Sequence, residues 1–362
     1  METTALPTID TPLAHLHRGV NARMGTWFGC ALPDDFGEWR TEYSFARETV
    51  ALIDKNYRAH LSFIGPDRGR YLNAILTSDV KNLLENRGTV SLLLNPQGRI
   101  LAEVETYALH DKLFCVSYAM IRERLIAWMD KYIIMDDVTL TDESEQYATL
   151  ALEGPLAAEA VQQVSGISLA GMADLESHEA SVGIVPCRIV KRSPRGVAGA
   201  EFITNRASAE TLWRLLSEVV TKHGGGAMGY AALNALRLEQ GIPWFGYDFG
   251  EKQIPHEAGL QDSHISYTKG CYTGQEIVER VRSRGQTNRV RVLMKFAGTA
   301  PESGTVFLAQ EKEVGYVTRA GFSPELQTNI GMSYVRREKS TVGSELNYAG
   351  GSATVIEPPL HS

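Results

Sequence analysis

The residue pattern changes near residue 289, and this change limits what the chain can fold into. Before it, stretches with helical periodicity alternate with short β-prone runs, which is typical of an α+β fold. After Arg289 the helical periodicity fades, and β-prone runs separated by glycine and proline turns follow at residues 290–296, 314–318, 330–334 and 352–356. Short strands of this kind predict a small β-barrel. We therefore predict an α+β region over residues 1–285, divided near residue 145, and an all-β barrel over residues 286–362.

A hairpin is predicted within the α+β region. Residues 91–95 and 100–109 are β-prone, and the turn between them contains Pro96, Gln97 and Gly98. Side chains alternate along a strand, so the second run has two faces. One face carries Ile100, Ala102, Val104, Thr106 and Ala108, and the other carries Glu103, Glu105 and Tyr107.

Charge and cysteine content exclude several classes of protein. The 362 residues include 36 lysines and arginines against 43 aspartates and glutamates, a formal net charge of −7 that argues against non-specific binding to nucleic acid or membranes. No run approaches the ~20 apolar residues of a membrane span, and residues 1–20 lack a secretory signal. The four cysteines have no zinc-ligand spacing. We expect reduced thiols, no metal site and a cytoplasmic location.

The segment from Lys269 to Glu276 is the strongest candidate for chemistry. Thr273 followed by Glu276 has the spacing of a capping box, and a helix is predicted from residue 274 to 284, with Gly285 as its C-terminal cap. Cys271 lies just before this helix, whose dipole, together with Lys269, favours a thiolate. Cys271 is therefore a candidate reactive thiol. A small buried apolar role for it stays open.

Five arginines follow within a short stretch: Arg280, Arg282, Arg284, Arg289 and Arg291. Arg280 and Arg284 share one face of the predicted helix. They are candidates for an anion site that takes carboxylates or RNA phosphates, although a solvated charged face would look the same. No aromatic residues are interleaved for base stacking, which favours a small anion over RNA.

The octapeptide Lys-Gly-Cys-Tyr-Thr-Gly-Gln-Glu at residues 269–276, followed by Arg284-Gly285, resembles the signature of the folate-binding YgfZ-type iron–sulfur cluster maintenance proteins. Other segments resemble the wider superfamily of the glycine cleavage T protein, an aminomethyltransferase. They are residues 25–33 and 47–54 near the start, 95–100 in the hairpin, 236–243 (Leu-Arg-Leu-Glu-Gln-Gly-Ile-Pro) and 256–260 (His-Glu-Ala-Gly-Leu). The resemblance covers nearly the whole chain.

This resemblance implies a three-lobed, aminomethyltransferase-like fold with tetrahydrofolate, or a derivative of it, in the middle. Glu201 matches the glutamate that pairs with the pterin ring, a two-point contact that a carboxylate can make. Val104, Thr106 and Ile242 match positions that face the folate, and Arg280 and Arg284 would contact its glutamate tail. The key thiol is Cys271, within the motif formed by Lys269, Gly270, Gly274, Gln275 and Glu276.

Two departures from the superfamily bear on function. Ala102 stands where aminomethyltransferases have an aspartate, and Leu233 stands where they have an arginine. Alanine cannot act as an acid or a base. We therefore predict a monomeric, folate-binding accessory protein for iron–sulfur cluster assembly or repair, with iron–sulfur client proteins as its partners. The alternatives are a folate-dependent aminomethyl or methyl transferase and an RNA-binding protein that uses the arginines. Whether the chain catalyses a reaction stays open.

Overall fold

The computed structural model describes residues 7–193 and 198–358. The chain divides into two compact units. The first unit comprises residues 1–73, 79–90 and 104–233, and the second comprises residues 74–78, 91–103 and 234–362. No helix of the described residues is long and apolar enough to cross a membrane.

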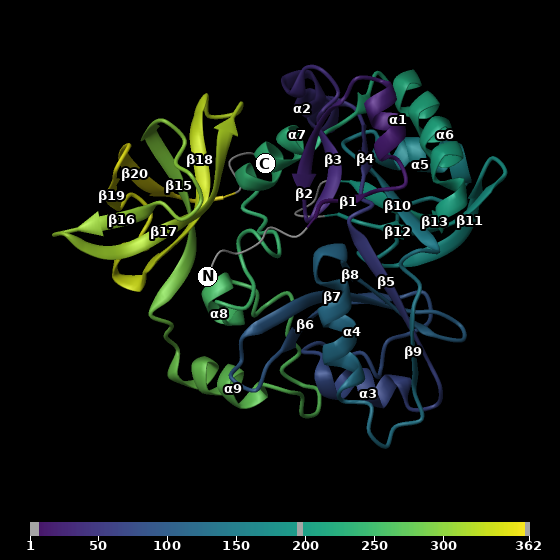
Figure 1. The fold of residues 1–362 in the computed structure, drawn as a ribbon, viewed down its shortest axis with the longest axis horizontal. Helices are drawn as coiled ribbons and strands as arrows, with labels where there is room; N and C mark the ends of the chain where they lie inside the picture. Colours follow the sequence, from purple (N-terminus) through teal and green to yellow (C-terminus); the bar gives the residue numbers. More distant parts are fainter. Residues whose placement is uncertain (1–6, 194–197, 359–362) are drawn as a thin grey trace. The chain divides into compact units, whose positions relative to one another are not determined.

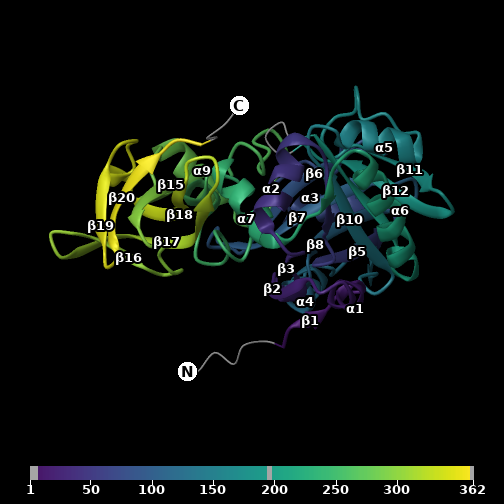
Figure 2. The same ribbon diagram turned by 90° about the horizontal axis from the view of Figure 1, so that it is seen from above.

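A six-stranded sheet forms the centre of the first unit, with the strand order β11-β12-β13-β10-β4-β14 (Figure 1). Its strands are β4 (Ala51–Asp54), β10 (Tyr147–Glu153), β11 (Ser177–Val182), β12 (Val185–Lys191), β13 (Gly199–Asn205) and β14 (Gly226–Ala227). Helices α5 (Ala157–Ser165) and α6 (Ala209–Lys222) lie beside this sheet in both views (Figures 1 and 2). The apolar stripe of α6 contains Leu212 and Leu216, and both are fully buried against sheet residues such as Leu150.

A second, three-stranded sheet has the order β1-β3-β2. The elements around it are β1 (Ile9–Asp10), α1 (Ala14–Gly19), β2 (Arg23–Trp27), β3 (Cys30–Asp35) and α2 (Trp39–Glu48). The side chain of Glu38 caps α2 by accepting from the Arg40 amide.

The third sheet has five strands in the order β6-β7-β8-β5-β9, and the division between the units passes through β6 and β7. Its elements are β5 (Arg58–Ile64), α3 (Arg68–Ile75), β6 (Gly88–Leu94), β7 (Ile100–Ala108), β8 (Leu113–Tyr118), η1 (Ala119–Ile121), α4 (Arg122–Asp130) and β9 (Thr139–Asp142). The predicted hairpin strands are present as β6 and β7. Nearly every side chain of β7 is buried, including Glu105 and Tyr107 on the face that carries the glutamates.

The second unit contains the helices α8 (Pro255–Ala258) and α9 (Gln275–Arg284) and most of α7 (Tyr230–Glu239). A closed barrel follows, with the order β15-β18-β17-β16-β19-β20. Its elements are β15 (Arg289–Gly298), β16 (Val306–Ala309), β17 (Lys312–Ser323), β18 (Thr328–Arg336), η4 (Arg337–Lys339), β19 (Glu345–Tyr348) and β20 (Gly351–Ile356). The remaining short helix, η3 (Arg206–Ser208), belongs to the first unit.

Alternating apolar side chains fill the barrel. Met294 and Phe296 of β15 and Ala353 and Val355 of β20 point inward, and Phe296 stacks near Phe307 with 6.4 Å between ring centroids. Burying a side chain of this size contributes roughly 1.5–3 kcal/mol. The structure therefore confirms the predicted fold class, an α+β region followed by an all-β barrel.

Candidate functional site

Six charged side chains of the first unit form one connected group, which we name the buried network: Lys55, Arg58, Glu105, Glu153, Arg192 and Glu201. Arg192 is partly exposed, and the other five are at least nine-tenths buried. Three positive charges meet three negative charges, so the network is neutral as a whole. Burying a charge away from water is costly unless an opposite charge lies beside it, and every charge of the network has such a partner.

Glu201 is the centre of the network. Its Oε1 lies 3.0 Å from Arg58 Nη2, 3.4 Å from Lys55 Nζ and 3.8 Å from Arg192 Nε. The side chain of Glu201 is 1 % exposed. All ion pairs and hydrogen bonds recorded for Glu201 among the described residues pass through Oε1. Its second oxygen is therefore the one that can accept from a ligand.

Arg58 links the two glutamates that lie farthest inside. The same Nη2 also donates to Glu105 Oε1 at 3.2 Å, and the guanidinium lies over the rings of Tyr57 and Tyr118, at 5.2 and 5.8 Å from their centroids. The Nε of Arg58 is buried and has no hydrogen-bond partner among the described residues. An unpaired buried donor costs roughly 1–3 kcal/mol, so this atom marks a place where a ligand acceptor would be stabilising.

The network comes from residues that are far apart in the sequence. Lys55 and Arg58 flank the turn between β4 and β5, and Glu153 is the last residue of β10. Glu201 stands opposite Ala151 on β10 and opposite Val190 on β12. Glu105 on β7 is held from its other oxygen by the Tyr107 hydroxyl at 2.7 Å. Five parts of the chain, at residues 55–58, 105, 153, 192 and 201, therefore build the group.

The charges of the network control its protonation. Burial alone would raise the pKa of Glu201, but the positive charges of Arg58, Lys55 and Arg192 outweigh it and hold that pKa well below its usual range. Burial would lower the pKa of Lys55, but Glu153 and Glu201 outweigh it and raise that pKa. Both side chains therefore stay ionised at neutral pH.

The fit of a pterin ring can be tested on these atoms. A pterin presents an amine and a ring N–H beside a ring carbonyl oxygen. The second oxygen of Glu201 can accept from the first pair, and the unpaired Arg58 Nε can donate to an acceptor. The donor and acceptor set of the network therefore fits a pterin.

Two other predicted contacts, Val104 and Thr106, are fully buried in β7. Thr106 Oγ1 lies 3.5 Å from Cys115 Sγ on the neighbouring strand β8. By alternation, Val104 and Thr106 lie on the face of β7 opposite to Glu105, which is the β7 residue that belongs to the buried network. Their folate contacts stay predictions.

The two departures from the superfamily are both buried. Ala102 on β7 is fully buried, and Leu233 on α7 is 9 % exposed. The neighbour of Ala102, Glu103, is held by His264, with 3.0 Å between Glu103 Oε1 and His264 Nε2. The other ring nitrogen, His264 Nδ1, lies 2.7 Å from Ser263 Oγ. Glu103 therefore has a fixed partner of its own.

The signature segment 269–276 differs from its prediction at the helix start. The N-cap of α9 is Gly274, which has a left-handed φ of 83° and makes no side-chain cap. The predicted capping box of Thr273 and Glu276 is therefore wrong. The left-handed turn moves the cap one residue past Thr273, and Glu276 pairs with Arg280 instead, at 3.2 Å. The predicted C-terminal cap at Gly285 is present.

Cys271 is exposed, whereas Cys30, Cys115 and Cys187 are buried. The ammonium of Lys269 donates to the backbone carbonyls of Leu76 and Ser78 and lies 5.2 Å from the centroid of Tyr272. Lys269 thus ties the segment to the residues after α3. The role of Cys271 as a reactive thiol, and of Gly270, Gln275 and Glu276 as its motif, stays a prediction.

Two glycines allow the hairpin turn to pack closely against the start of α9. Gly98 has φ 72°, and a Cβ placed there would lie 2.8 Å from Ile277 Cγ2. A Cβ on Gly274 would lie 2.7 Å from the carbonyl oxygen of Asn95. Real Cβ atoms essentially never come this close, so both positions require glycine.

The remaining predicted contacts lie in the second unit. Ile242 is partly buried just after α7, and its amide donates to the Arg237 carbonyl at 2.8 Å. Arg280 is half exposed on α9, and Arg284 is the last residue of that helix. Arg291 instead donates to the carbonyls of Ala258 and Gly241, so it holds the fold of this unit.

Lys55, Arg58, Glu105, Glu153 and Arg192 were not predicted as site residues. The sequence carried one signal for Glu105. It lies in a strand that is otherwise mostly apolar or aromatic, and a glutamate buried in such a strand needs a partner. The partners themselves carried no signal, since Lys55 and Glu201 are 146 residues apart.

Two family descriptions match this chain: the GCVT N-terminal domain over residues 13–264 and the glycine cleavage T-protein C-terminal barrel domain over residues 288–361. An aminomethyltransferase of Rubrobacter xylanophilus is 29 % identical over 91 % of this chain and 87 % of its own length. One from Anoxybacillus flavithermus is 28 % identical over 93 % of both. The crystal structure of the glycine cleavage system aminomethyltransferase T from Bartonella henselae superposes with a TM-score of 0.88, at 22 % identity and 98 % coverage of both chains.

These comparisons overturn one prediction. The relatives are named aminomethyltransferases and align over almost the whole chain, which supports the transferase alternative and contradicts the predicted iron–sulfur accessory function. The octapeptide covers eight residues, whereas the alignments cover more than nine-tenths of the chain. The superposition at 22 % identity supports the fold alone.

Proposed function

Because the chain belongs to the glycine cleavage T-protein family, we propose that it is a folate-dependent one-carbon transferase of the aminomethyltransferase type. The observation that carries this proposal is the alignment with named aminomethyltransferases over more than nine-tenths of the chain. Family membership also confirms the predicted tetrahydrofolate cofactor. The octapeptide and Ala102 resemble the YgfZ-type branch, but the proposal follows the chain-wide alignment and includes no iron–sulfur function.

Glu201 is the proposed pterin anchor. Its negative charge is fixed by Arg58, Lys55 and Arg192, so the carboxylate keeps its charge and its position without a ligand. Such preorganisation lowers the cost of ordering the site when the ligand binds. Bound tetrahydrofolate supplies the nitrogen nucleophiles that take up a one-carbon unit. The network orients the ring and excludes water from its polar edge.

Ala102 limits the chemistry that the chain itself can supply. No acid or base can act from that position, and the carboxylate of Glu103 is held by His264. We propose that this chain promotes transfer mainly by binding and orienting its reactants, which can account for large rate effects by itself. The one-carbon donor is then one with a good leaving group. The free thiols support a reducing compartment, and we propose the cytoplasm.

Calorimetry with tetrahydrofolate tests the anchor. Glu201→Gln removes the charge and exchanges one acceptor oxygen for a donor, so we expect it to weaken binding about tenfold or more. Glu179→Gln is the matched control, since Glu179 is 83 % exposed and pairs only on the surface. A thermal melt of each variant shows whether it is folded.

Methylene transfer to tetrahydrofolate from an aminomethylated lipoyl carrier tests the activity. Turnover above the rate without protein supports the proposed function. Wild-type protein that binds no tetrahydrofolate, or that binds it and produces no transfer from any one-carbon donor tried, contradicts it.

A further inference from the structure

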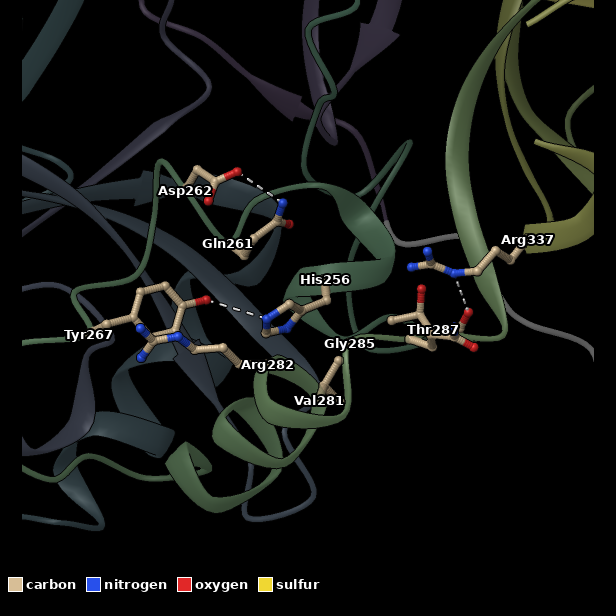
Figure 3. A pocket seen from close by; sticks show the side chains of 10 residues that line it. His256, Gln261, Asp262, Tyr267, Val281, Arg282, Gly285, Thr287 and Arg337 are labelled. Atoms are coloured by element: carbon tan, nitrogen blue, oxygen red, sulfur yellow. Dashed lines mark hydrogen bonds between the residues drawn. The ribbon is translucent and has the colours of Figure 1, made fainter. Parts of the chain in front are cut away.

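A pocket of about 310 Å³ lies in the second unit, beside the end of α9 (Figure 3). Helix α8 contributes His256, the loop after it contributes Gln261 and Asp262, and α9 contributes Arg282. Thr287 from the segment before β15 and Arg337 from η4 also line it. The volume is within the range of small-molecule sites, about 300–1,000 Å³.

Three polar atoms of this lining are buried and have no partner among the described residues: His256 Nδ1, Gln261 Oε1 and Thr287 Oγ1. Thr287 is 7 % exposed. Tyr267 lies 3.3 Å from His256 Nε2, and we assign the phenol as the donor, which leaves the proton on Nδ1. Each unpaired atom is destabilising, because it has lost its hydrogen bonds to water and gained none in the protein. Small side-chain rotations into the pocket would let a bound ligand satisfy them.

The charges of the pocket are separated. Arg337 and Thr287 lie on one side of His256, and Gln261 and Asp262 lie on the other (Figure 3). Among the described residues neither Arg337 nor Asp262 has an ion-pair partner, although Arg337 Nε donates to the Thr287 carbonyl at 3.1 Å and Asp262 accepts from Gln261 Nε2 at 3.0 Å. Arg282 is stacked on Tyr267 at 4.1 Å and paired with Glu279 at 3.5 Å, so its charge is largely offset.

A purely anionic ligand does not fit this arrangement. Asp262 would repel it, and so would the C-terminal end of α9, which carries partial negative charge and reaches the pocket at Gly285. A purely cationic ligand would meet Arg337 and the Nδ1–H of His256. A zwitterion, which carries one positive and one negative charge, can pair with Asp262 and with Arg337 at the same time.

We propose that this pocket binds a small zwitterion of the amino-acid class, with its carboxylate toward Arg337 and Thr287 and its ammonium toward Asp262 and Gln261. His256 donates to the ligand between the two charged ends. The proposal does not depend on the proposed transferase function.

Three small molecules of matched shape test it: L-alanine, propionate, which lacks the amine, and ethylamine, which lacks the carboxylate. Each is titrated into full-length protein labelled with ¹⁵N-histidine. The imidazole signals of His256 are assigned by their loss in His256→Gln and report binding at this pocket. We expect saturable shifts with L-alanine and at least about tenfold weaker binding of propionate and of ethylamine, because each loses one charge-assisted contact.

Two variants separate the ends of the pocket. Asp262→Asn is expected to remove the preference for L-alanine over propionate, and Arg337→Gln to remove the preference over ethylamine. Arg336→Gln is the matched control, since Arg336 is the neighbour of Arg337 and also exposed but does not line this pocket. The proposal is overturned if L-alanine causes no saturable shift, if propionate binds as tightly as L-alanine, or if Arg336→Gln weakens binding as much as Arg337→Gln.

Discussion

The buried network and helix α9 are both rich in charge, but they use it differently. In the network, six side chains are paired with one another away from water. On α9, Arg280 and Arg282 are each 52 % exposed and paired with a glutamate of the same helix. The arginines of α9 are conspicuous in the sequence, and those of the network are not.

Burial decides how much each charge matters. Removing one partner of a buried pair leaves an uncompensated charge and costs roughly 3–5 kcal/mol, whereas an exposed helical pair contributes roughly 0.3–0.5 kcal/mol. A cluster of basic residues is therefore weak support for a site until its burial is known. The following predictions test this difference, from the largest expected effect to the smallest.

Arg58→Met is expected to lower the free energy of unfolding by roughly 3–5 kcal/mol, because it leaves Glu105 and Glu201 buried with less compensation. Urea denaturation measures the change. The matched control is Arg280→Met, expected to stay within about 0.5 kcal/mol of wild type. Equal losses in the two variants would remove the distinction between the regions.

The buried region also predicts a pH dependence. Burial, together with the charge of Arg58, lowers the pKa of His60 to about 3. The unfolded chain therefore takes up a proton near pH 6.5 that the folded chain does not, so stability is complete above that pH and falls below it. Between pH 6.5 and 4.5 the loss from His60 is roughly 2.5 kcal/mol.

Urea denaturation across this range in wild type and in His60→Gln isolates that contribution. Glutamine cannot take up the proton, so the stability of the His60→Gln variant should fall less than that of the wild type. Parallel curves for the two proteins would show that His60 is protonated in the folded state.

Gly98→Ala tests whether α9 is held by packing instead of charge. An alanine at this positive φ would also press on Ile277, and we expect a loss of about 2 kcal/mol. Gly285→Ala is the control, because Gly285 has the same φ of 72° and no atoms within 4 Å of an added Cβ. It should cost only about 1 kcal/mol. Thermal denaturation compares them, and equal costs would exclude a steric contribution from Ile277.

Cys271→Ser is expected to change stability by less than about 0.5 kcal/mol, as an exposed substitution should. Its effect is on reactivity. In the native wild-type protein a thiol reagent should rapidly modify one cysteine, and in the native variant it should modify none. In urea all four cysteines of the wild type should react. Rapid modification of more than one native thiol would contradict the burial of the other three.

Local patterns predicted local structure well. The barrel strands, the hairpin and the C-terminal end of α9 all follow from periodicity and turn residues. The capping box failed because Gly274 adopts a left-handed φ of 83° and becomes the N-cap in place of Thr273, which sequence spacing does not reveal. The predicted iron–sulfur function was also wrong, because it rested on one short segment. The octapeptide covers a small part of the chain, whereas the chain-wide match with aminomethyltransferases draws on all of it.

The candidate site was predicted only in part. Glu201 followed from resemblance, but its environment required knowing which strands pair. Arg58 begins β5 and Glu201 lies in β13, and no local pattern links them. Val104 and Thr106 were assigned from the same strand as Glu105, and one residue along a strand decides which face a side chain occupies.

The contact of Gly98 with Ile277 and of Gly274 with Asn95 has a consequence for protein engineering. The hairpin turn packs against Gly274 of the octapeptide and against Ile277, the residue that follows it, with no space for a methyl group. Transplanting the octapeptide into another scaffold without its turn would carry over the cysteine but not the support that positions it. The smallest transferable piece of this protein is the octapeptide together with the hairpin turn.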